Sequence, residues 1–136
     1  MFRIIALSLL LLSPQISAAQ GFPERQLRVR VAALSATTFE VVDGIDTGPR
    51  QTWCAAAQFA KRKFGVSGGQ LWLARGLGPS TAMPGRRSTV FSIEPVPNEY
   101  KSISLSIRRA GQSVMFSLAS SLCRNSDFRV RLRDIS

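Results

Sequence analysis

The segment from Gly48 to Gly65 constrains the fold more than any other part of this sequence, because it has the features of a complete amphipathic helix. Pro49 suits the first helical position, where a missing N–H group costs nothing, and this makes Gly48 the N-cap. Gly65 can adopt the left-handed conformation that ends a helix. At about 100° per residue, one apolar stripe forms, and it consists of Trp53, Ala56, Ala57, Ala60 and Phe64. We therefore predict one helix over residues 49–64 whose small central side chains allow close packing against a sheet.

The N-terminus has the three-part pattern of a secretory signal peptide. A basic residue, Arg3, precedes an apolar run over residues 4–12, and small residues follow at positions 17–19. The run is far shorter than the roughly 20 residues that a membrane-spanning helix needs. We expect residues 1–19 to be removed on export to the periplasm or the cell exterior. The mature protein would have no membrane span and would form a single domain over residues 20–136.

The chain contains two cysteines, one of which, Cys54, lies at the edge of the apolar stripe of the helix. Two cysteines in an exported chain most simply pair with each other, so we predict a Cys54–Cys123 disulfide. The bond would close a loop of roughly 70 residues and contribute about 4 kcal/mol to stability in the chain-entropy account. A free, reactive cysteine is the alternative.

The composition is strongly basic, with 18 lysines and arginines against 8 acidic residues and a formal net charge of +10. Most of the basic residues are arginine, whose planar side chain makes forked contacts with carboxylate and phosphate groups. This balance favours an anionic partner, such as a phosphate-bearing envelope polymer, an acidic lipid head group, an acidic protein or nucleic acid. The alternative is that the charge only keeps an exported protein soluble.

Alternation of apolar and polar residues predicts a mostly antiparallel sheet of about five to six strands, with the helix packed on it and one disulfide joining the two. The predicted strands cover residues 26–34, 37–42, 70–75, 88–93, 102–107 and 128–133. The clearest alternation is at 102–107, and 109–112 would be a hairpin turn. Residues 113–123 suit either a helix or, as we prefer, a strand that runs into one helical turn at Ser120. The strand–helix–strand order of residues 37–75 also allows a right-handed crossover with parallel strands. The fold class is α+β.

Two sets of arginines are candidate anion-binding sites, and the first lies in the first and last predicted strands. Side chains two residues apart along a strand project from the same face of the sheet, so the arginines of each strand share one face. These residues are Arg28, Arg30, Arg129, Arg131 and Arg133. If the two strands are neighbours, like charges repel by a few tenths of a kcal/mol per pair, and an anionic ligand would relieve that repulsion. The alternative is a solvated face that carries its charge without cost.

The second set surrounds a glycine-rich segment, residues 76–88, which is long for a loop in so small a domain. Its arginines are Arg75, Arg86 and Arg87. Between them, residues such as Gly78, Ser80 and Thr81 could offer free backbone N–H groups, and these groups beside guanidinium ions can form an anion-binding concavity. A flexible basic loop without such a role is the alternative.

The chain contains no histidine, and this excludes His-dependent catalytic triads and His-ligated metal sites. Pairing of both cysteines would also remove thiol catalysis, and we expect no metal and no cofactor. For a small hydrolase, the remaining groups are a serine activated by Lys61, Lys63 or Lys101, and the carboxylate pairs Glu94 with Glu99 and Asp43 with Asp46.

Together these features favour an exported, non-catalytic binding module that engages an anionic polymer, an acidic lipid head group or an acidic protein. A small hydrolase is one alternative, and an inhibitor or structural partner of another exported protein, with an exposed apolar patch, is another. Nucleic acid is disfavoured as a partner by the export pattern, the single tyrosine and the lack of a recognisable reading motif.

Overall fold

The computed structural model describes residues 25–124 and 127–136, so the proposed signal peptide lies outside the described residues. The elements in chain order are β1 (Arg25–Ala33), β2 (Thr38–Val42), α1 (Pro49–Phe64), β3 (Gln70–Pro79), β4 (Arg87–Ser92), β5 (Ser113–Met115), α2 (Phe116–Ser121), a short 3-10 helix η1 (Leu122–Arg124) and β6 (Phe128–Asp134).

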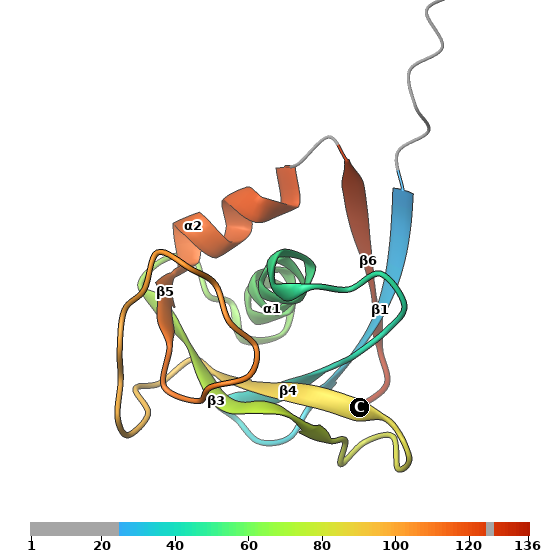
Figure 1. Ribbon diagram of the computed structural model, residues 1–136, viewed down its shortest axis with the longest axis horizontal. Coiled ribbons are helices and arrows are strands. Elements are labelled where there is room, and N and C mark those ends of the chain that lie inside the picture. Colours follow the sequence, from blue (N-terminus) through green and yellow to red (C-terminus); the bar gives the residue numbers. More distant parts are fainter. Residues whose placement is uncertain (1–24, 125–126) are drawn as a thin grey trace, which may run out of the picture.

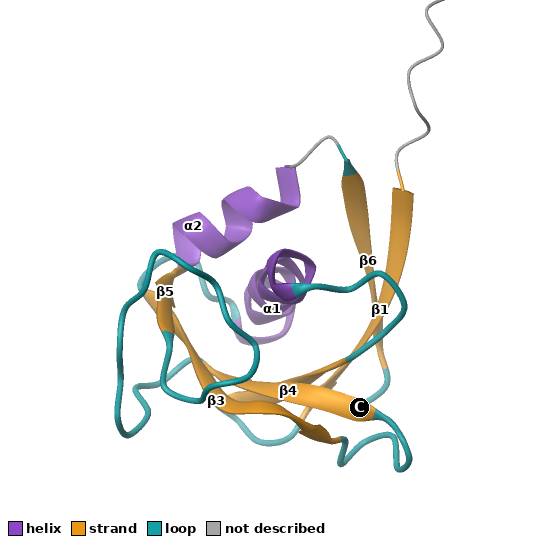
Figure 2. Ribbon diagram, in the orientation of Figure 1, coloured by secondary structure: helices purple, strands orange, loops and turns teal. Residues whose placement is uncertain are grey.

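The six strands form one mixed sheet in the order β5-β3-β4-β2-β1-β6. The pairing of β1 with β6 is parallel, and the other neighbouring strands are antiparallel. The sheet curls around α1, and α2 lies on the side of α1 that the sheet leaves open (Figure 1). The predicted α+β architecture, with one main helix packed on a mostly antiparallel sheet, is confirmed (Figure 2).

The crossover between β2 and β3 takes a form that local patterns do not specify. Both strands are antiparallel to β4, which lies between them, so β2 and β3 run in the same direction without being neighbours. The predicted parallel strands on either side of the helix are therefore present, but a third strand is inserted between them.

The ends of α1 are those that the sequence predicts. Gly48 is the N-cap, and its N–H group donates to Oε1 of Gln51 at 3.1 Å. Gly65 ends the helix with φ at 69°, a left-handed conformation that glycine adopts without steric cost. Three basic residues occupy the last turn, where cations interact favourably with the negative end of the helix dipole.

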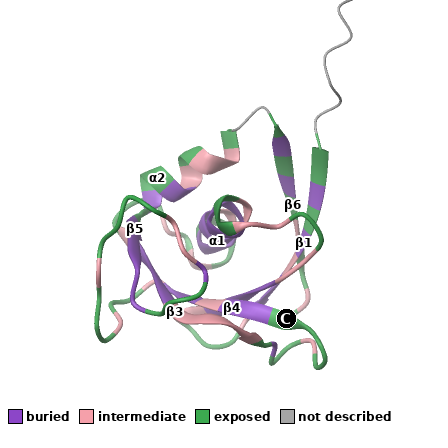
Figure 3. Cartoon of the chain, in the orientation of Figure 1, coloured by how far each residue is buried: buried purple, intermediate pink, exposed green. Residues whose placement is uncertain are grey.

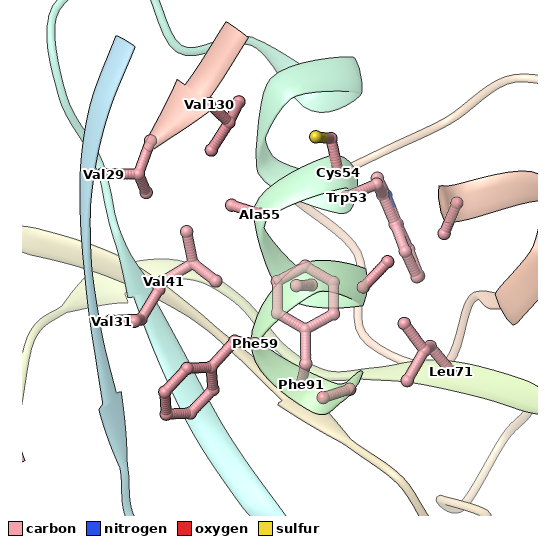
Figure 4. Packing of buried hydrophobic residues seen from close by; sticks show 14 of the residues in the cluster. Val29, Val31, Val41, Trp53, Cys54, Ala55, Phe59, Leu71, Phe91 and Val130 are labelled. Atoms are coloured by element: carbon pink, nitrogen blue, oxygen red, sulfur yellow. The ribbon is translucent and has the colours of Figure 1, made fainter. Parts of the chain in front are cut away.

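Trp53 of α1 is fully buried at the centre of an aromatic core. Its indole ring and the ring of Phe91 make a T-shaped contact with centroids 4.9 Å apart, and Phe91 in turn stacks on Phe39 at 5.8 Å. The Trp53 Nε1–H group donates to the carbonyl of Ser106 at 3.0 Å, so the buried indole nitrogen has a partner. Figure 4 shows that Val29 and Val130, from β1 and β6, point towards α1 in the same core.

The predicted disulfide is confirmed between Cys54 on α1 and Cys123 on η1. The two Cα atoms are 5.1 Å apart, and the sequence separation is 69 residues. Cys54 is fully buried, and the bond fastens the C-terminal part of the chain to the central helix. The alternative of a free cysteine is wrong for this structure, in which the described cysteines are paired.

The strand predicted over residues 102–107 is wrong, because this segment is a loop. Ile103, an apolar residue of the alternating pattern, is fully exposed, whereas Ile107 packs on the core from the loop. The buried side chain of Gln112 replaces strand pairing, since it donates to the carbonyl of Ser104 at 2.9 Å and accepts from the N–H group of Ser106 at 2.8 Å. A turn does lie within 109–112, but it joins no hairpin.

The glycine-rich segment at 76–88 is shorter as a loop than predicted, because β3 continues to Pro79 and β4 begins at Arg87. The strand pairing shifts register between Leu73 and Gly78. This irregularity interrupts the alternation of apolar and polar residues that predicts a strand from sequence. Gly76 lies so close to the 102–112 loop that an added Cβ would be 2.1 Å from the carbonyl oxygen of Arg108.

Residues 113–123 combine the two alternatives that the sequence leaves open. They begin as the short strand β5, as preferred, but the helix starts at Phe116 rather than at Ser120. Phe116 and Ala119 are the buried residues of α2, so its spacing is that of a helix packed on one side.

Candidate functional site

The first and last described strands, β1 and β6, are neighbours, so the condition for a shared arginine face is met. Their parallel register places Arg28 opposite Arg131 and Arg30 opposite Arg133. One step earlier, Gln26 lies opposite Arg129. Residues paired in this way project from the same face of the sheet, so the arginines form two rows that cross both strands.

The opposite face of the same strands explains why the arginines point outward. Leu27, Val29 and Val31 of β1, together with Phe128 and Val130 of β6, are buried in the core that faces α1. Because successive side chains of a strand alternate between faces, burying the apolar set directs the intervening arginines to solvent. Figure 3 shows this alternation of buried and exposed residues along both strands.

The outward side chains surround an open groove of about 460 Å³, lined by Arg28, Arg30, Arg131, Leu132 and Arg133. We call its four guanidinium-bearing residues (Arg28, Arg30, Arg131 and Arg133) the arginine face. The two arginines of one row lie on neighbouring strands about 4.8 Å apart, and the two rows are separated by about 6.6 Å along the strands. Four positive charges therefore lie within reach of a single ligand.

The arginine face has no counter-ion in the part of the chain that the structure describes. Two salt bridges among the described residues join Arg25 to Asp46 at 3.0 Å and Lys63 to Asp134 at 3.3 Å, and neither includes a residue of the arginine face. None of the four guanidinium groups forms a salt bridge with, or donates a hydrogen bond to, another described residue. Repulsion between arginines that lie opposite each other is thus relieved by solvent and by dissolved ions.

The second predicted set, at the β3–β4 loop, is organised differently. Arg75 donates to the carbonyl of Pro79 at 2.8 Å and to Oγ of Ser88 at 2.7 Å, so its guanidinium group holds the chain's own backbone and side chains. Arg86 donates to the carbonyl of Asp43 at 3.0 Å, which ties this loop to the β2–α1 loop.

Arg86 and Arg87 border a separate open groove of about 360 Å³, together with Asp43, Gly44, Ile45 and Gly85. This groove shares no lining residue with that of the arginine face. The strand β2 lies between β4 and β1, and Arg86 and Arg87 therefore line a groove that is separate from that of the arginine face.

The N–H groups that we expected to be free in this loop bind an anion that belongs to the protein itself. Glu40, on β2, is fully buried beneath the loop. Its carboxylate accepts hydrogen bonds from the N–H groups of Thr81 at 3.1 Å and Ala82 at 2.7 Å, and from the hydroxyl groups of Ser80 at 2.7 Å and Ser88 at 2.8 Å. The N–H groups of Thr81 and Ala82 are therefore occupied by a carboxylate of the protein itself.

Burial acts to raise the pKa of Glu40, but the hydrogen bonds from Ser80, Ala82, Ser88 and Thr81 together outweigh it and hold the pKa below its ordinary value. The carboxylate is thus charged at neutral pH and fastens the loop to the sheet. Sequence reasoning missed this role, although one signal was available: Glu40 is the single charged residue in an otherwise apolar and β-branched strand.

Of the carboxylates considered for a hydrolase, Asp43 and Asp46 have structural contacts, and Glu94 is exposed. Asp46 pairs with Arg25, and Asp43 accepts a hydrogen bond from the hydroxyl group of Thr47 at 3.1 Å. Glu99 is exposed, and the nearby Ser113 hydroxyl and Trp72 indole groups lower its pKa.

The lysines considered as activators of a serine, Lys61, Lys63 and Lys101, are all exposed. Lys63 binds Asp134 rather than a serine. A serine–lysine catalytic pair needs a lysine held in a desolvated pocket beside the serine, and none of these three lysines is buried.

The described residues contain no group of three or more cysteine, aspartate or glutamate side chains that could hold a metal ion. No helix within residues 25–124 and 127–136 is both long enough and apolar enough to cross a membrane. Comparison of the chain with protein-family models, with curated proteins and with solved structures finds no match.

Proposed function

We propose that this protein is an exported, non-catalytic binding module whose arginine face engages an anionic partner. The observation that carries the proposal is the parallel, in-register pairing of β1 with β6, which gathers four guanidinium groups around one groove, and none of the four forms a salt bridge with a described residue. The disulfide and the N-terminal sequence pattern support export, because disulfides persist in oxidising compartments.

The energetics of the face favour a ligand that carries several negative charges. Each arginine gains a charge-assisted, often forked contact, which is about twice as strong as a neutral hydrogen bond. The ligand also removes the repulsion between Arg28 and Arg131 and between Arg30 and Arg133, which lie opposite each other. The β3–β4 loop is a weaker candidate, because Arg75 and the loop N–H groups already hold groups of the protein.

The test is binding of the mature protein to an anionic matrix such as phosphocellulose, with the salt concentration needed for elution as the readout. Arg131→Gln/Arg133→Gln should weaken binding by about tenfold or more, since each charge-assisted contact is worth about 1.5–3 kcal/mol when fully formed. The matched control is Arg50→Gln/Arg108→Gln, which removes the same charge from two exposed positions outside the groove.

Retention of the unmodified protein above roughly 0.5 M salt would indicate a specific site, because diffuse attraction is screened at that concentration. Equal loss of binding in the two double variants would show that only net charge matters, and the proposal would then be wrong.

A further inference from the structure

The strand β6 is the end strand of the sheet, with β1 on one side and no strand paired to its other side among the described residues. The N–H group of Ile135, just after β6, donates to the carbonyl of Val31 at 2.9 Å and so points towards β1. Because successive N–H groups along a strand point to opposite edges, those of Arg131 and Arg133 also face β1, whereas those of Leu132 and Asp134 face away. The backbone at Leu132 and Asp134 is therefore an open pairing edge.

The two sides of this edge differ in chemistry. On the outer side lies the arginine face. On the inner side, between α1 and β6, lies a second groove of about 170 Å³, lined by Phe59, Arg62, Lys63, Leu132 and Asp134. Leu132 borders both grooves, so the edge of β6 separates a cationic surface from one that is partly apolar and rimmed by cations.

We propose that the partner is an acidic protein segment that binds in extended conformation and adds as a further strand to the open edge of β6. This inference rests on the proposed function and specifies its ligand. Backbone pairing at Leu132 and Asp134 would supply affinity, as in other cases of strand addition to a sheet edge. Acidic side chains of the segment would lie beside Arg131 and Arg133, and the alternate, apolar side chains would lie towards Leu132 and the groove at Phe59.

The match in spacing supports this class of partner. An extended peptide with an acidic residue at every second position repeats its charge about every 6.6 Å, which is the spacing of the arginines along β6 because both chains have the same pleat. Opposite charges on adjacent strands stabilise the pair. A phosphate polymer could occupy the arginine face, but it has no apolar groups for the inner groove and no backbone to pair with the edge.

The first experiment compares synthetic seven-residue peptides for binding to the mature, disulfide-bonded protein by isothermal titration calorimetry. One peptide alternates glutamate and valine, and its control has the same composition with glutamates and valines in separate blocks. The alternating peptide should bind about tenfold more tightly, since the block peptide places only part of its charge beside the arginines. Two N-methylated versions of the alternating peptide test the backbone contact, one methylated at the odd-numbered residues and one at the even-numbered residues. One version should lose binding and the other should keep it, because the N–H groups of only one of these two sets face β6.

The second experiment changes the edge of the protein. Leu132→Pro removes an outward N–H group without removing a hydrogen bond to β1, a position where proline is compatible with an edge strand. Leu132→Pro should lower the affinity for the alternating peptide much more than Leu132→Ala, which shortens the side chain but keeps the N–H group. If the proline variant does not fold, the methylated peptides still test the same contact from the ligand side.

The possible outcomes separate this inference from the proposed function. Equal binding of the alternating and block peptides, or equal effects of the two methylated sets, would overturn strand addition and leave anion binding intact. If inorganic polyphosphate bound and neither peptide did, the ligand would be a phosphate polymer and this inference would be wrong. If neither the peptides nor polyphosphate bound, both proposals would fall.

Discussion

Replacing Glu40 with glutamine should destabilise the protein by about 3 kcal/mol, although the change removes only one charge and preserves the size of the side chain. The carboxylate is fully buried and accepts four hydrogen bonds, two on each oxygen. Glutamine presents one NH₂ group, which donates and cannot accept. Whichever way the amide is turned, the N–H group of either Thr81 or Ala82 loses its acceptor.

The magnitude follows from these contacts. A buried N–H group left without a partner costs about 1–3 kcal/mol, and the remaining bonds lose the extra strength that a charged acceptor provides. The hydroxyl groups of Ser80 and Ser88 can rotate and offer an oxygen to the new NH₂ group, so they lose less. A loss of about 3 kcal/mol would lower the melting temperature of a domain of this size by roughly 10 °C or more.

The assay is urea-induced unfolding followed by circular dichroism, with Glu94→Gln as the control. Glu94 is exposed, so its variant makes the same change in net charge without disturbing a buried acceptor, and it should be nearly neutral. If Glu40→Gln cost less than about 1 kcal/mol while the loop kept its structure, the four hydrogen bonds would not hold the loop as inferred.

The pH dependence gives an independent check on Glu40. Its pKa in the folded protein lies below the ordinary value of 4.5, so its stabilising effect is fully present above that value and is lost as the pH falls through the folded pKa. The difference in unfolding free energy between the unmodified protein and Glu40→Gln should therefore be constant near neutral pH and should shrink in acid. A difference that grew in acid would contradict the direction of the pKa shift.

Two further changes test how the chain is held together. Cys54→Ala/Cys123→Ala should lower the free energy of unfolding by up to about 4 kcal/mol, because the bond closes a separation of 69 residues, and urea unfolding of the variant should resemble that of the reduced, unmodified protein. Gly76→Ala should lower the melting temperature, at a cost of about 1–3 kcal/mol, because its Cβ would be 2.1 Å from the Arg108 carbonyl oxygen. Gly68→Ala, where a Cβ would meet nothing within 4 Å, is the matched control, and similar effects of the two alanine variants would contradict the close approach at Gly76.

Much of the architecture could be predicted because it is written in short stretches of sequence. The signals for α1 are steric and local: Pro49 has no N–H group to satisfy, Gly65 tolerates a positive φ, and an apolar residue recurs at each turn. The disulfide followed from the number of cysteines together with the expected compartment. The outward direction of the arginines on each strand followed from the alternation of side chains between the two faces of a strand.

The failures share a cause, which is competition from groups distant in the sequence. The alternation at 102–107 satisfies the local rule for a strand, but the side chain of Gln112 and the indole N–H group of Trp53 bind its carbonyl groups instead of a neighbouring strand. The N–H groups of the β3–β4 loop are likewise taken by Glu40, some 40 residues away along the chain. Such partners become visible only when the chain is folded.

The sequence by itself determined which residues form the central helix, which cysteines pair and which side of each strand carries charge. Only the tertiary structure decided that the first and last described strands lie side by side, in a register that sets Arg28 against Arg131 and Arg30 against Arg133. Periodicity acts over a few residues, because it depends on the geometry of one strand. The choice of neighbouring strands is made by the whole core, since the sheet has to curl around α1 until β6 covers the helix, and the candidate site is a product of that closure.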